Sequence, residues 1–158
     1  MLKTFATICI IGMFTSSCTS KKASRTEGSH EAEQDLTMIV GTYTSGDSKG
    51  LYSFRFNEEN GTATALSEAE VENPSYLVPS ADGKFIYAVS EFSNEQAAAN
   101  AFAFNKEEGT FRLLNTQKTG GEDPCYIITN GSNVVTANYS GGSISVFPID
   151  KDGSLLPA

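Results

Sequence analysis

An all-β fold built from a repeated four-stranded antiparallel sheet is predicted by three observations on the 158-residue chain. First, short β-prone runs are joined by glycine turns, as in residues 133–148, where Ser140-Gly141-Gly142 connects two such runs. Second, polar turns recur in step, because Gly61, Gly109 and Gly153 stand 48 (61 to 109) and 44 (109 to 153) residues apart. Third, no long run shows the 3.6-residue apolar period of a helix. A repeat of this length made only of strands is typical of a β-propeller blade.

Each repeat is expected to hold four strands, A to D, and the chain to hold about two and a half blades. The first blade has strands B (38–43), C (51–56) and D (62–71), without a strand A. The second has A (75–79), B (85–91), C (100–104) and D (110–115). The third has A (125–129), B (133–139), C (143–149) and a D strand that begins at Leu155. Pro74-Ser75-Tyr76 and Pro124-Cys125-Tyr126, which are 50 residues apart (74 to 124), mark the start of strand A twice.

Residues 1–17 have the features of a signal peptide rather than of a folded element. Lys3 precedes an apolar run, residues 5–14, that is too short to span a bilayer. Thr15-Ser16-Ser17-Cys18 resembles the lipobox of bacterial lipoproteins, although Thr15 stands where leucine is usual. The resemblance implies that Cys18 becomes a lipidated N-terminus on an exported, membrane-anchored protein of the periplasm or cell surface. The alternative is an ordinary secretory peptide in which Cys18 has no role.

Residues 18–36 are polar and without apolar periodicity, and we expect them to form a flexible tether before a domain at residues 37–158. The net charge of −8 disfavours nucleic acid as a partner, since nucleic-acid binding calls for a basic face. No phosphate loop, no dinucleotide fingerprint and no metal-ligand spacing occurs, so neither cofactor nor metal is expected. Cys125 is expected to be a small buried residue rather than a nucleophile.

Five motifs together resemble the lactonase family of seven-bladed β-propellers, from about Met38 to the C-terminus. They are residues 41–46, 72–77, 87–91, 120–125 and 137–148. The resemblance implies a seven-bladed fold, of which this chain is an N-terminal part, and hydrolysis of a lactone, a carboxylic-ester hydrolase activity. One departure is Tyr126, because the family usually has histidine after the Pro-Cys pair. The family's histidine- and arginine-bearing segments lie further downstream than Ala158.

Propeller geometry divides the loops between two faces, because neighbouring strands run in opposite directions. The A–B and C–D turns on one face are ordinary turn sequences. The B–C and D–A loops on the other face carry carboxylates, amides and tyrosines that a turn does not need. Functional groups concentrate on loops held by a rigid scaffold, so the site is expected on this second face.

Glu91 and Asn138 are the candidate catalytic residues on that face. Glu91 ends a B strand, where its carboxylate would activate water for attack on a lactone carbonyl; the alternative is a solvated strand-end glutamate. Asn138 would donate a hydrogen bond to the oxyanion; the alternative is an amide that ties strand B to strand C. The candidate substrate-binding residues are Tyr76, Tyr126, Asn73 and Tyr139, with aromatic packing and turn formation as the alternatives for the first three.

The sequence therefore predicts a cofactor-free hydrolase of sugar-type lactones, monomeric when full length and bound to the membrane only through its lipid. Its ligand would be a lactone or sugar acid. A phosphorylated gluconolactone is a cytosolic intermediate, so an exported protein is expected to use an unphosphorylated aldonolactone or related ester. Two alternatives remain, a non-catalytic propeller that binds a ligand or protein and a carboxymuconate cyclase-like activity. Residues 19–158 made alone are expected to aggregate and to be inactive, because propellers close with at least about four blades.

Overall fold

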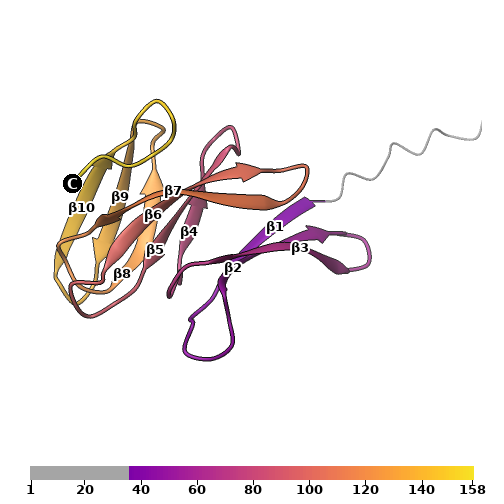
Figure 1. Ribbon diagram of the computed structural model, residues 1–158, viewed down its shortest axis with the longest axis horizontal. Helices are drawn as coiled ribbons and strands as arrows, with labels where there is room; N and C mark the ends of the chain where they lie inside the picture. The colour runs from indigo at the N-terminus through magenta and orange to yellow at the C-terminus, as the bar shows by residue number, and fades with distance from the viewer. Residues whose placement is uncertain (1–35) are drawn as a thin grey trace, which may run out of the picture. The chain divides into compact units, whose positions relative to one another are not determined.

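The computed structural model describes residues 36–158, and every regular element in that range is a β-strand (Figure 1). The strands are β1 (Leu36–Gly41), β2 (Gly50–Phe56), β3 (Ala63–Glu70), β4 (Leu77–Pro79), β5 (Phe85–Ser90), β6 (Ala98–Asn105), β7 (Thr110–Lys118), β8 (Pro124–Thr129), β9 (Asn133–Asn138) and β10 (Ser143–Pro148). The described part therefore contains no helix that could cross a membrane. The predicted signal peptide, Cys18 and most of the predicted tether lie outside the described residues.

Three antiparallel sheets follow one another along the chain, in the orders β1-β2-β3, β4-β5-β6-β7 and β10-β9-β8. This confirms the predicted all-β blades, with no strand A in the first and only an Ile149–Leu155 bridge where the D strand of the third begins. Strand β4 starts at Leu77, two residues later than predicted. The reason is that Asn73 has a positive φ of 46° and the chain turns there before it can join the ladder.

The four-stranded sheet lies between the other two and is buried on both faces (Figure 1). Alternate residues of β5 enter different cores because successive side chains of a strand point to opposite faces. Tyr87 and Val89 pack with Phe147 of the third sheet, whereas Ile86 and Ala88 pack with Leu51 of the first. This explains why β5 and β6 read as nearly continuous apolar runs rather than alternating ones.

The face of the third sheet that points away from β5 is exposed. Ile128, Ile144 and Val146 are 47%, 69% and 43% exposed, on strands β8 and β10. Cys125 at the start of β8 is exposed as well, so the expectation that it is buried is wrong. Its Sγ has one weak contact, 4.0 Å from the carbonyl oxygen of Ala137. Exposed apolar side chains of this kind favour association. The expected aggregation of residues 19–158 made alone stays a prediction.

The loops separate into the two predicted sets. On one side, the turns end in glycines whose carbonyl oxygens accept hydrogen bonds from the preceding sheet. The hydroxyl of Ser53 donates to Gly109 at 2.6 Å, and the hydroxyl of Tyr87 donates to Gly153 at 3.2 Å. On the other side, the loops that follow β1, β3, β5, β7 and β9 are joined to one another by hydrogen bonds. The second set holds the candidate site.

Candidate functional site

Two Asx-Pro joints organise the loop face that carries the candidate residues. Asn73 and Asp123, each directly before a buried proline, have φ values of 46° and 50°, a region that Asn and Asp tolerate better than other non-glycine residues. In this conformation the carbonyl oxygen of Asn73 accepts the backbone N–H of Glu91 at 3.0 Å. The carbonyl oxygen of Asp123 accepts that of Tyr139 at 2.9 Å in the same way. Each joint thus fixes the end of the B strand in its own blade.

The side chain of each joint reaches back to the preceding blade. Oδ1 of Asn73 accepts the backbone N–H of Thr44 at 3.0 Å and its hydroxyl at 3.1 Å. Oδ1 of Asp123 accepts the hydroxyl of Ser93 at 2.6 Å. The hydroxyls of Ser140 and Ser93 hold the pKa of Asp123 below its usual value, because both donate to the carboxylate. Asn73, predicted to bind substrate, therefore lies at the site with its side-chain oxygen already used between blades.

Glu91 is the centre of a hydrogen-bonded cluster formed by three separate loops. The hydroxyl of Tyr43, from the loop after β1, donates to Oε2 of Glu91 at 2.9 Å. The hydroxyl of Ser75, directly after the Asn73 joint, donates to the same oxygen. Asn73 completes the cluster, since its Nδ2 donates to the backbone carbonyl of Glu91 at 3.3 Å. Both hydroxyl donors thus converge on Oε2, and Oε1 accepts no hydrogen bond from residues 36–158.

Tyr43 is a hydroxyl donor throughout the neutral pH range. Its pKa is raised above the usual value, first because its hydroxyl donates to Glu91, then through partial burial and the negative charge of that carboxylate. Tyr43 is 57% exposed, so the contact lies at the surface rather than in the core. A raised pKa makes the phenol a poor proton donor in chemistry and a stable hydrogen-bond donor in the ground state.

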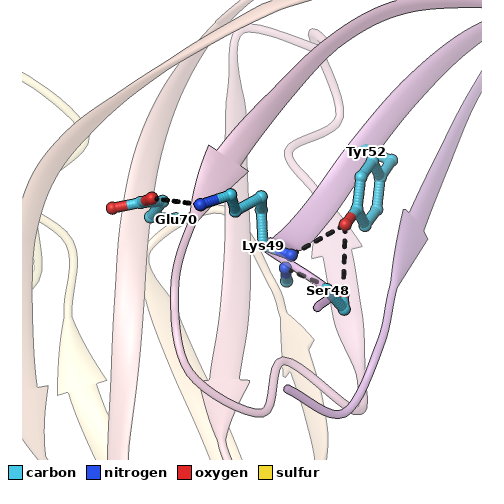
Figure 2. Close-up of polar contacts among 5 residues, drawn as sticks. Ser48, Lys49, Tyr52 and Glu70 are labelled. Carbon is cyan, nitrogen blue, oxygen red and sulfur yellow. Dashed lines mark hydrogen bonds and ion pairs between the residues drawn. The ribbon is translucent and has the colours of Figure 1, made fainter. Parts of the chain in front are cut away.

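The loop that carries Tyr43, residues 42–49, is held in place by a second network on its far side (Figure 2). The hydroxyl of Tyr52 in β2 accepts the backbone N–H of Lys49 at 2.7 Å and contacts the hydroxyl of Ser48 at 3.1 Å. Lys49 Nζ lies 2.9 Å from Glu70 Oε1, an exposed pair at the base of the loop. Exposed pairs contribute little to stability, so the Tyr52 hydroxyl is the stronger anchor.

Tyr76 and Tyr126 lie together where β4 and β8 begin. Their ring centroids are 4.8 Å apart with an interplanar angle of 50°, and each side chain is more than two fifths exposed. Tyr76 directly follows Ser75 of the Glu91 cluster. The pair therefore forms an exposed aromatic surface, of the kind expected of residues that contact a sugar ring. Substrate binding by Tyr76 and Tyr126 stays a prediction.

Asn138 is buried and fully engaged by its own hairpin. Its Nδ2 donates to the hydroxyls of Ser143 at 3.1 Å and Ser145 at 2.8 Å, and its Oδ1 accepts the hydroxyl of Thr136 at 3.0 Å. Both N–H groups are used, so none is left to donate to an oxyanion. The geometry favours the alternative reading, an amide that ties strand B to strand C.

Tyr139, the next residue, is 81% exposed and lies on the same loop face as Glu91. Within residues 36–158 no group of three or more His, Cys, Asp or Glu side chains lies together as metal ligands would. Among the predicted site residues, Glu91 alone carries a carboxylate, and two hydroxyls donate to it.

Tyr43 and Ser75 contact Glu91 at the candidate site but were not among the residues predicted from the sequence, although both lie in motifs noted there. Each comes from a loop on the predicted face, 48 and 16 residues before Glu91. The contact with Tyr43 joins two blades, and nothing in the local pattern of residues 42–46 specifies it. Position on the loop face was the only available signal.

The sequence model of the family described as lactonase, 7-bladed β-propeller, matches residues 37–158. The chain belongs to this family. A Bacillus subtilis protein named 6-phosphogluconolactonase is 38% identical over 122 residues, which cover 73% of this chain and 34% of that protein. A Formosa agariphila protein of the same name is 34% identical over 125 residues, which cover 75% of this chain and 35% of that protein.

Solved structures agree with the fold. A Bacteroides fragilis protein described as a candidate 6-phosphogluconolactonase superposes with a TM-score of 0.79 at 70% identity, over 81% of this chain and 36% of that one. A periplasmic gluconolactonase of Pseudomonas aeruginosa superposes with a TM-score of 0.70 at 31% identity, over 77% of this chain and 36% of that one. The chain thus spans about a third of the length of the relatives it matches.

Proposed function

We propose that the complete protein containing this chain hydrolyses a sugar-type lactone, with Glu91 as the general base. The observation that carries the proposal is the Glu91 carboxylate, half-buried on the predicted loop face, with two hydroxyls donating to Oε2 and no hydrogen bond from residues 36–158 to Oε1. Membership of the lactonase family supports the reaction class. The remaining blades would supply the rest of the site.

In this mechanism Oε1 of Glu91 accepts a proton from a water molecule while the water oxygen attacks the lactone carbonyl carbon. A tetrahedral intermediate forms, its collapse breaks the ring carbon–oxygen bond, and the proton passes from Glu91 to the departing alkoxide. One water is consumed and one hydroxy acid is formed. Tyr76 and Tyr126 would support the apolar side of the sugar ring.

The substrate we propose is an unphosphorylated aldonolactone. The predicted export of the protein supports this choice, because a phosphorylated gluconolactone arises in the cytosol. The name of the Pseudomonas aeruginosa neighbour, a periplasmic gluconolactonase, is consistent with it. The Bacillus subtilis relative is named for the phosphorylated lactone, so both forms belong in the test.

The test is an initial-rate assay of acid release from gluconolactone and from 6-phosphogluconolactone, with the spontaneous rate subtracted. We expect the complete protein to accelerate hydrolysis of the unphosphorylated lactone in proportion to its concentration, and to prefer it over the phosphorylated form. Preference for the phosphorylated form would refute the substrate choice. No acceleration of either would refute the lactonase assignment and favour a ligand-binding propeller.

We further propose that the protein is exported and anchored through a lipid on Cys18. The support is the apolar run of residues 5–14 followed by Thr15-Ser16-Ser17-Cys18. Wild-type protein should partition into detergent and carry the mass of an acylated cysteine after removal of residues 1–17, whereas Cys18→Ala should not be acylated. Identical masses apart from the substitution, with both proteins soluble in the periplasm, would contradict the anchor.

A further inference from the structure

The Glu91 cluster contains more than the base that the proposed function requires. A strand-end glutamate in solvent samples several rotamers, and a general base must keep one oxygen aligned with the attacking water. Here two hydroxyls from separate loops, Tyr43 and Ser75, hold the same oxygen, Oε2. Such convergence fixes the rotation of the carboxylate and leaves Oε1 as the oxygen without a hydrogen bond from residues 36–158.

The positions of the two donors are themselves fixed. Ser75 follows the strained Asn73 joint, whose carbonyl oxygen accepts the backbone N–H groups of both Ser75 (2.8 Å) and Glu91 (3.0 Å). Tyr43 directly precedes Thr44, whose backbone N–H donates a hydrogen bond to Oδ1 of Asn73. The loop that carries Tyr43 is also anchored by the hydroxyl of Tyr52 (Figure 2). Asn73 therefore positions both donors, Tyr43 and Ser75, relative to the Glu91 carboxylate that accepts from them.

We propose that Tyr43 and Ser75 are positioning residues that hold Oε2 of Glu91, so that Oε1 is the oxygen that takes the proton from water. This inference rests on the proposed lactone hydrolysis. Tyr43 acts through Glu91 and not as an acid in its own right, since its raised pKa keeps the phenol protonated. The first blade thus contributes to a base that belongs to the second, and the site is assembled across the blade interface.

A double-mutant cycle on the complete protein tests this inference. Tyr43→Phe removes only the hydroxyl, and we expect kcat to fall about tenfold with KM within about twofold, because the base is misaligned while binding is kept. Ser75→Ala should behave similarly. In a Glu91→Gln background, Tyr43→Phe should have no further effect, because residues that act through one another are not additive.

The matched control is Tyr87→Phe, which removes a buried hydroxyl bonded to Gly153 on the opposite loop face and should leave kcat within about twofold. Additive losses in the cycle, or an unchanged kcat in Tyr43→Phe, would overturn the positioning role while leaving lactone hydrolysis intact. Absence of lactone turnover in the wild type would overturn both proposals.

A spectroscopic titration provides a readout that does not need turnover by the variants. The phenolate signal of Tyr43 is isolated by subtracting the spectrum of Tyr43→Phe from that of the parent. Glu91→Gln should lower the pKa of Tyr43, because the negative charge that the phenol donates to is removed. If Glu91→Gln is too slow to measure above spontaneous hydrolysis, this titration replaces the kinetic cycle as the test of the contact. An unchanged pKa of Tyr43 would show that the side chains of Tyr43 and Glu91 are not in contact in solution.

Discussion

Glu91→Gln should reduce kcat for lactone hydrolysis by a factor of about 10² to 10⁴, the usual contribution of a general base. The amide keeps the size of the side chain, and its oxygen still accepts the hydroxyls of Tyr43 and Ser75. Folding should therefore be unaffected, and KM should change by no more than a few-fold. Steady-state rates of the complete protein, with thermal melts of both forms, make the comparison.

Glu72→Gln is the matched control for this substitution. Glu72 is an exposed carboxylate on the same loop face, in the segment that leads to the Asn73 joint. Its substitution by glutamine removes one negative charge, as Glu91→Gln does. We expect it to keep the wild-type rate. A Glu91→Gln protein that folds normally and retains full activity would remove Glu91 from the mechanism.

Gly41→Ala should destabilise the interface between the first two blades by about 3 kcal/mol, the upper part of the range for overpacking. A Cβ added at Gly41 would lie 2.0 Å from the backbone carbonyl oxygen of Pro74, a group that cannot move aside as a flexible side chain can. Pro74 lies between the Asn73 joint and Ser75, so the Glu91 cluster would be displaced too. The expected result is a lower apparent melting temperature together with reduced kcat.

Gly46→Ala is the control for this prediction, because a Cβ at Gly46 meets nothing within 4 Å. It places the same methyl group in the loop that carries Tyr43. We expect its melting temperature and activity to match the wild type. If Gly41→Ala has the same melting temperature as the wild type, the close approach of the first blade to Pro74 is not maintained in solution.

The sheets were predictable from the sequence because each depends on local signals. Glycine turns set the hairpin registers, and alternation or continuity of apolar residues distinguishes half-buried strands from those buried on both faces. The late start of β4 was not predicted. It follows from the positive φ of Asn73, a conformation that the residue tolerates but that its identity alone does not require.

The site was predictable only in part. Glu91 could be placed on the candidate loop face because strand direction alternates around a blade, and its position there needs no knowledge of its neighbours. Tyr43 could not be assigned as a partner of Glu91 from the sequence. The two residues are 48 positions apart in neighbouring blades, and their contact depends on how the loop that carries Tyr43 folds. Asn138 was predicted to donate to an oxyanion, but its N–H groups are not free. Both donate to Ser143 and Ser145, and the position of Asn138 in a hairpin does not reveal this.

We propose, above all, that the loop face around Glu91 hydrolyses a lactone. It is tested most directly by the initial rate of acid release from gluconolactone, measured side by side for the complete wild-type protein and its Glu91→Gln variant above the spontaneous rate. We expect a rate proportional to wild-type concentration, and a rate lower by about two to four orders of magnitude in the variant. A wild-type rate equal to the spontaneous one, or equal rates for the two proteins, would contradict it.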